Sequence, residues 1–155
     1  MVLRFADEAC LDVASAGGKG ASLARMTAFG MPVPPGFVVH ADTLAASLPD
    51  GGAELRRAAR EQRERALALV AAAEIADELR RAVEVAYAEL GDGNHAVAVR
   101  SSACAEDSQE ASFAGQQETY LNVQGHQALL DACKRCFASL FTDRAISYRV
   151  EKGFE

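Results

Sequence analysis

Residues 17–39 of this chain read GGKGASLARMTAFGMPVPPGFVV, and this stretch decides the fold class. The glycine-rich run 17–20 predicts a turn, and the apolar residues after it recur at helical spacing: Leu23, Met26 and Phe29. Gly30 stands where a glycine commonly ends a helix. Prolines then favour an extended approach to the apolar strand 37–39. The stretch therefore predicts a glycine turn that leads into a helix, a loop and a buried strand.

Helices dominate the centre of the chain. The side chains of residues 2–5 alternate in character enough to predict a short edge strand. From residue 53 to 90 the composition shifts to Ala, Glu, Arg and Leu, which favours helices. We expect two helices here, which meet near residues 71–73. The second has an apolar face made of Ile75, Leu79, Val83, Ala86 and Leu90.

The last third returns to strands and then to helices. Residues 96–100 and 118–123 read as strands, separated by a long polar loop. Helical spacing of apolar residues resumes at 128–140 and 143–150. We therefore expect an α+β fold with a mixed sheet flanked by helices.

Length and charge limit the function. At 155 residues, the chain is one domain or two small subdomains, 1–93 and 94–155. Its net charge of -6 argues against a nucleic-acid partner, and no segment approaches a membrane span or a signal peptide. We expect a soluble, cytoplasmic protein that holds a small anion through a few placed cations and backbone N–H groups.

The run from Gly17 to Gly20 favours a phosphate ligand. Glycines admit close backbone approach, a helix N-terminus favours anions, and Lys19 adds a positive charge. The pattern is not a P-loop, because Val13 and Gly20 stand where that motif needs Gly and Ser or Thr. A plain turn remains an equal alternative.

Two further segments have phosphate-binding features. Arg100 follows a strand and can grip phosphate oxygens, with the hydroxyls of Ser101 and Ser102 as added donors. The alternative is a surface Arg paired with Glu106 or Asp107. The segment 112–117, SFAGQQ, reads as a loop that closes over a nucleotide or as a flexible connector.

The cysteines and histidines indicate no catalytic or metal site. Cys133 and Cys136 have the spacing of a redox or zinc pair, but they lie inside a helical pattern and read as packing thiols. We expect no structural disulfide from the four cysteines. His40, His95 and His126 share no ligand spacing, so none is assigned a catalytic role.

Three strings of the sequence together resemble a known family. They are residues 17–39, then 98–123 (AVRSSACAEDSQEASFAGQQETYLNV), then 136–154 (CFASLFTDRAISYRVEKGF). In this order and spacing they are similar to the N-terminal ATP-binding region of the phosphoenolpyruvate synthase and pyruvate phosphate dikinase family, which includes rifampicin phosphotransferases. QQETYLNV and SLFTDRAISYR resemble the synthase branch most. Cys104 stands where the family commonly has Thr.

The resemblance implies a partial ATP-grasp-like fold and a set of nucleotide contacts. Lys19 and Arg100 are expected at the ATP phosphates, with Gly115, Gln116 and Thr119 on the loop and strand that cover them. Two cations can offset the charge of a transferring phosphoryl group.

The resemblance also implies partners that this chain does not supply. The second half of the ATP-grasp fold, with the Mg²⁺ ligands, the phosphohistidine domain and the pyruvate domain are expected elsewhere in a longer enzyme. The implied reaction converts ATP, pyruvate and water to phosphoenolpyruvate, AMP and phosphate through a phosphohistidine, with no catalytic residue in this part. The alternatives are an antibiotic phosphotransferase and a stand-alone, non-catalytic nucleotide-binding module.

Overall fold

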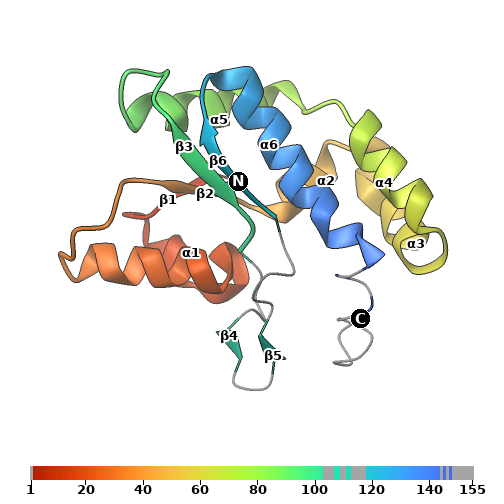
Figure 1. Cartoon of the computed structure of the whole chain (residues 1–155), viewed down its shortest axis with the longest axis horizontal. Helices are drawn as coiled ribbons and strands as arrows, with labels where there is room; N and C mark the ends of the chain where they lie inside the picture. The colour runs from red at the N-terminus through yellow and green to blue at the C-terminus, as the bar shows by residue number, and fades with distance from the viewer. Residues whose placement is uncertain are drawn as a thin grey trace.

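The computed structural model describes residues 2–102, 107–108, 111–112, 118–143, 145 and 147. These residues form a mixture of helices and short strands in which helices predominate (Figure 1). The helices are α1 (Val13–Ala28), α2 (Ala41–Ala46), α3 (Ala53–Glu61), α4 (Arg63–Ala72), α5 (Asp77–Glu89) and α6 (His126–Ala138). Short 3₁₀ turns occur at Glu8–Leu11, Pro49–Gly52 and Ser139–Phe141.

The described strands form two-stranded antiparallel sheets. The strands are β1 (Val2–Arg4), β2 (Phe37–Val39), β3 (Val97–Arg100), β4 (Asp107–Ser108), β5 (Ala111–Ser112) and β6 (Thr119–Val123). The pairs are β1 with β2, β3 with β6 and β4 with β5. The α+β class is confirmed, whereas the expected mixed sheet is replaced, in the described residues, by three separate antiparallel pairs of strands.

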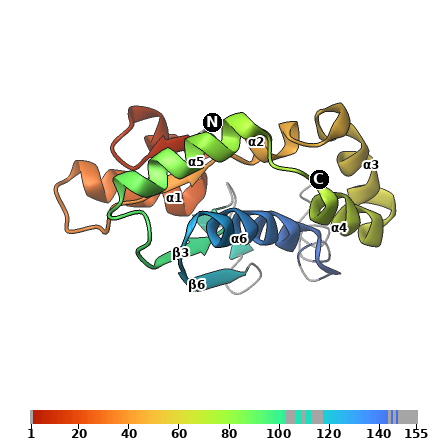
Figure 2. The same cartoon turned by 90° about the horizontal axis from the view of Figure 1, so that it is seen from above.

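Helix α6 lies at the centre of the packing. Seen from above, it runs between α5 and strand β6 (Figure 2), and it contacts both. The main core holds residues from α2, α5 and α6: Leu44, Leu79, Val83, Tyr87, Leu129 and Leu130. Partly buried residues of the β1–β2 and β3–β6 pairs, such as Val39 and Val99, pack against this core.

The apolar face predicted for α5 is confirmed. Leu79, Val83 and Ala86 are buried, and Ile75 and Leu90 pack at the edge of the main core. The number of helices was wrong, because 53–90 contains three helices rather than two. Breaks occur at Gln62, whose φ is -145°, and at residues 73–76.

Helix α1 differs from its prediction at its start. The helix begins at Val13, before the glycines, because the Asp12 carboxylate accepts hydrogen bonds from the Ala14 N–H at 3.1 Å and the Ser15 hydroxyl at 2.9 Å. These two bonds lower the pKa of Asp12. At the other end Gly30, with φ of 72°, closes the helix as predicted, and the Met31 N–H donates to the Met26 carbonyl.

The buried face of α1 consists of small residues. Ala16, Ala21 and Ala24 pack with Leu3 and Cys10 against the β1–β2 pair. Phe29, in contrast, is 83% exposed although it continues the apolar spacing of the helix. Small side chains allow the helix to approach the strands closely, so the larger apolar residues do not mark its inward face.

Other segments also bear on the sequence predictions. The short helix α2 was not expected, and β4 and β5 lie within the stretch read as a loop. The helix expected at 143–150 lies largely outside the described residues, and Asp143, Ala145 and Ser147 are helical. Within the described ranges, no helix is long and apolar enough to cross a membrane.

Tyr87 links α5 to the segments on either side of the β3–β6 hairpin. Its side chain is fully buried, and its hydroxyl donates to the His95 carbonyl at 2.6 Å and accepts from the Gly125 N–H at 3.1 Å. The rings of His95 and His126 contact the Tyr87 ring with centroid separations of 4.8 and 5.4 Å. The hydroxyl thus satisfies two backbone groups at once.

We predict that Tyr87→Phe destabilises the chain by about 1–3 kcal/mol, because it leaves the half-buried His95 carbonyl and Gly125 N–H without their partner. Urea unfolding followed by circular dichroism measures the change. Tyr120→Phe is the matched control, since Tyr120 is only half-buried. An equal loss in both variants would contradict the role given to the Tyr87 hydroxyl.

Candidate functional site

The glycine run forms a kink inside α1. Gly17 has φ of 70° and ψ of 171°, a backbone conformation that essentially only glycine adopts. Helical geometry resumes at Gly18, so residues 18–28 form a second helical segment with its own N-terminus. The predicted glycine turn is therefore present, but inside α1 rather than ahead of it.

The kink is packed against the end of strand β3. A Cβ atom on Gly17 would lie 2.0 Å from the carbonyl oxygen of Ser102. A Cβ atom on Gly20 would lie 2.9 Å from Cγ2 of Val38 in β2. Glycine at these two positions therefore allows α1 to touch both the segment after β3 and the strand β2.

Ser102 joins the kink to that segment through its side chain. The Gly20 N–H donates to the Ser102 Oγ at 2.9 Å, and the Ser102 hydroxyl donates to the Ala16 carbonyl at 2.8 Å. The Ser102 residue is half-buried. This pair of bonds connects residues that are more than 80 positions apart in the sequence.

The strand pair β3–β6 places two of the predicted site residues opposite each other. Arg100 is the register partner of Thr119, and both are exposed. The alternate residues of β3, Val97 and Val99, face the main core. The outer face of this hairpin therefore carries Arg100 and Thr119 side by side.

The same outer face has an apolar part next to these two residues. By strand alternation it includes Ala98 of β3 and Leu121 of β6, and Leu121 is 68% exposed. The pairing is irregular between Val97 and Val99, where Asn122 on the partner strand has φ of 56°. This bulge twists the hairpin beyond the Arg100–Thr119 pair.

Three of the five predicted site residues thus belong to adjoining segments. Lys19 is half-buried and precedes Gly20, whose N–H is bonded to Ser102. Arg100 lies two residues before Ser102, about 7 Å along an extended chain. Gly115 and Gln116 lie outside the described residues, as do Glu106 and Cys104. Sequence reasoning did not find the joining role of Ser102, although its place two residues after Arg100 had drawn attention to its hydroxyl.

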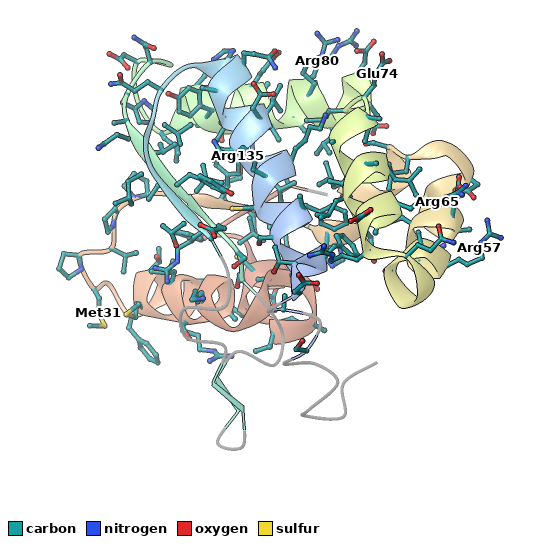
Figure 3. All side chains as sticks on the ribbon, turned by 45° about the vertical axis from the view of Figure 1, so that its right-hand side comes forward. Met31, Arg57, Arg65, Glu74, Arg80 and Arg135 are labelled. Atoms are coloured by element: carbon teal, nitrogen blue, oxygen red, sulfur yellow. The ribbon has the colours of Figure 1, made fainter. Side chains whose placement is uncertain are left out.

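A groove is formed by β6 and α6. It has a volume of about 590 Å³ and is lined by residues 119–124, which comprise β6 and the residue after it, and by residues of α6 that include Asp131 and Arg135. The Arg135 guanidinium stacks over the Tyr120 ring at 4.2 Å from its centroid. Arg135 lies in the last turn of α6, and Figure 3 labels it beside this helix. The groove begins at Thr119 and so adjoins the outer face of the hairpin.

The cysteine pair lies in the packing of α6, with Cys136 buried and Cys133 half-buried against the main core. Burial raises the pKa of Cys133 to about 12 and that of Cys136 to about 11. The Cys136 thiol donates to the Glu118 carbonyl at 3.7 Å. Both residues are free thiols, as is the buried Cys10. These surroundings support the interpretation as packing thiols. Among the described residues, no group of three or more His, Cys, Asp or Glu side chains could hold a metal ion.

Comparison with known proteins assigns the chain to a family. Residues 13–155 match the family described as pyruvate phosphate dikinase, AMP/ATP-binding domain. The chain belongs to this family of nucleotide-binding domains.

Individual relatives include phosphoenolpyruvate synthases. The chain is 42% identical to the phosphoenolpyruvate synthase of Escherichia coli, over 93% of this chain and 21% of that protein. It is 44% identical to a probable phosphoenolpyruvate synthase of Methanocaldococcus jannaschii, over 93% of this chain and 14% of that protein. It is 41% identical to the Neisseria meningitidis enzyme, over 99% of this chain and 22% of that protein. The chain thus spans less than a quarter of the length of these relatives.

Gly17→Ala should destabilise the chain by several kcal/mol. The new Cβ would overlap the Ser102 carbonyl, and the positive φ is strained for alanine. Gly30→Ala is the matched control, because Gly30 has nearly the same φ, 72°, with no atom within 4 Å of an added Cβ. It should cost only about 1 kcal/mol. Thermal unfolding measures both, and similar losses would contradict the close contact at Gly17.

The buried thiols predict a pH dependence of both reactivity and stability. Alkylation of Cys133 and Cys136 by iodoacetamide should be slow in the native chain and fast in urea, because the thiolate is the reactive form. The unfolded chain loses these protons near the ordinary pKa of 9.0, and the folded chain does so only at about 11 to 12. The free energy of unfolding should therefore fall as the pH rises above about 9.

Alkylation rates for the two cysteines come from mass spectrometry of peptides after timed quenching. The Cys133→Ala, Cys136→Ala double variant should show a shallower decline of stability at alkaline pH. Equal alkylation rates with and without urea would show that the two thiols are accessible, contrary to their burial.

Proposed function

We propose that this chain binds ATP as the N-terminal part of the ATP-binding domain of a phosphoenolpyruvate synthase. The observation that carries the proposal is the pair of hydrogen bonds made by the Ser102 hydroxyl. They connect the turn that contains Lys19 to the segment that directly follows the paired residues Arg100 and Thr119. We propose that the side chains of Lys19 and Arg100 and the helix N-terminus at Gly18 converge on one ligand from segments far apart in the sequence. Such a set suits a polyphosphate, whose charge is spread over several oxygens.

Each residue has a distinct part in this proposal. Arg100 grips phosphate oxygens with its guanidinium fork, and Lys19 adds a second charge from the kink of α1. Thr119 donates a hydroxyl hydrogen bond from the adjacent strand. The exposed Leu121 offers an apolar surface for the less polar part of the nucleotide. Gly115 and Gln116 are proposed to lie on a loop that covers the phosphates.

The proposal extends to the longer enzyme. Its reaction consumes ATP, pyruvate and water and releases phosphoenolpyruvate, AMP and phosphate, through a phosphohistidine on another domain. We further propose an ATP-grasp-like fold for the complete ATP-binding domain, with this chain as one part of it. The chain is 41–44% identical to phosphoenolpyruvate synthases, one of them a probable one, from three different organisms. This similarity favours the synthase branch of the family over an antibiotic phosphotransferase.

Magnesium does not fit the described residues of the site. Mg²⁺ prefers carboxylate oxygens, whereas Lys19, Arg100, Ser102 and Thr119 provide cations and hydroxyls. We propose that its ligands come from another part of the longer polypeptide. The chain alone is therefore expected to bind ATP weakly and without turnover.

We expect Lys19→Ala and Arg100→Ala each to weaken ATP binding by at least about tenfold, since each removes a charge-assisted contact worth about 1.5–3 kcal/mol. NMR titration with ATP reads weak affinities directly, and thermal unfolding of each variant should change little. Arg57→Ala is the control, because Arg57 is an exposed residue of α3, which packs against α4 on the side of the molecule shown in Figure 3.

Two results would contradict the proposal. One is the lack of any chemical-shift change with ATP at residues 17–20 and 100–102. The other is an equal loss of affinity in Arg57→Ala, which would indicate non-specific attraction between ATP and surface arginines. Tight binding by the chain alone would contradict only the expectation that other parts of the polypeptide complete the site.

A further inference from the structure

The Ser102 hydroxyl bonds the two backbone groups of α1 that would pair with each other in a regular helix. In an uninterrupted α-helix the N–H of Gly20 would donate to the carbonyl of Ala16, four residues earlier. The conformation of Gly17 interrupts this pattern, and the Ser102 hydroxyl lies between the two groups. It accepts from the Gly20 N–H at 2.9 Å and donates to the Ala16 carbonyl at 2.8 Å. A side chain from another segment is thus inserted into the hydrogen-bond ladder of α1.

We propose that Ser102 is a positioning residue that holds the kink of α1 open and sets the place of Lys19 relative to Arg100. This inference rests on the proposed nucleotide site. The kink lies between Ala16 and Gly20, so Lys19 is inside the segment that the hydroxyl spans. Arg100 is on the same short stretch of chain as Ser102 itself. One hydroxyl therefore controls the spacing of the two cations.

The hydrogen bonds of Ser102 also limit what else its hydroxyl can bind. A serine hydroxyl has one proton to donate, and here the Ala16 carbonyl accepts it. The hydroxyl therefore cannot at the same time donate to a phosphate oxygen. The sequence had suggested Ser102 as a phosphate donor, and the structure assigns it to the support of the turn.

Two other features strengthen the mechanical link. The backbone of Ser102 is in close contact with Gly17, since a Cβ added to Gly17 would fall 2.0 Å from the Ser102 carbonyl oxygen and 2.4 Å from its Oγ. Gly20 is close to Val38, whose Cγ2 atom would lie 2.9 Å from a Cβ added to Gly20. The turn is thus packed against both β2 and the segment after β3.

The first experiment follows the Gly20 amide by hydrogen exchange and NMR in the chain without nucleotide. In Ser102→Ala the Gly20 N–H loses its acceptor, and its exchange should become at least about tenfold faster. Ser102→Thr keeps a hydroxyl and should retain most of the protection. Ser139→Ala is the matched control, because the Ser139 hydroxyl is buried and, like that of Ser102, donates to a backbone carbonyl, that of Cys136, at 2.6 Å. Unchanged Gly20 exchange in Ser102→Ala would overturn the proposed bridge.

The second experiment tests whether Ser102 acts through Lys19. ATP affinity is measured for Ser102→Ala, Lys19→Ala and the double variant. We expect Ser102→Ala to weaken binding by about tenfold, and Lys19→Ala to have much less effect in that background than alone, because the lysine is then already displaced. Strictly additive losses would overturn the positioning role.

The two experiments separate the inference from the proposed function. If ATP does not bind the wild-type chain, the proposed function fails, and with it the part of the inference that concerns Lys19. The Gly20 exchange result would still stand or fall by itself, since it needs no nucleotide. A lower stability of Ser102→Ala alone, with Gly20 protected, would indicate a general packing role and overturn the bridge.

Discussion

The contact between the kink of α1 and the end of β3 is the constraint on which the described site depends. Between Gly20 and Ser102 the chain passes through β2, four helices and β3. The hydrogen bond between these two residues brings the two ends of this stretch into contact. A hydrogen bond adds only about 1 kcal/mol, far less than the ordering of the intervening residues costs. The helices are therefore stabilised mainly by the apolar clusters. The contact instead fixes the position at which the two ends of the stretch meet. The segments that carry Lys19 and Arg100 are brought next to each other as a result.

The helical part of the fold could largely be predicted because its signal is repeated along the chain. In α5 several apolar residues with one spacing lie on one buried face. The break at Gln62 has no such signal, because neither Gly nor Pro occurs there, and α3 and α4 are instead folded against each other by a shared cluster that includes Leu55 and Val70. Packing between distant segments decides such breaks. The early start of α1 did have a local signal in Asp12, a common N-cap residue.

The site could be predicted in its residues but not in its connections. Lys19, Arg100 and Thr119 were found from a glycine turn, a strand end and a family resemblance. The register that sets Arg100 opposite Thr119 depends on the bulge at Asn122, which no pattern in the sequence indicates. The role of Ser102 was not predictable either, because a hydroxyl next to an arginine suits a phosphate as well as it suits a backbone carbonyl. Only the positions of Ala16 and Gly20 distinguish these two uses.

The charges of the chain show why local geometry matters more than net charge here. With a net charge of -6, the protein as a whole repels an anion such as ATP. Several arginines are also paired with nearby carboxylates: Arg4 with Glu89, Arg63 with Asp143, Arg65 with Glu54 and Arg80 with Asp77. On the outer face of the β3–β6 hairpin, Arg100 lies instead beside Thr119, Ala98 and Leu121, none of which carries a charge. Its field is therefore not cancelled by these neighbours, and in the proposed site this local field attracts an anion within a few ångströms although the distant field is unfavourable. Specific placement of two cations, rather than an overall basic surface, is what such a site requires.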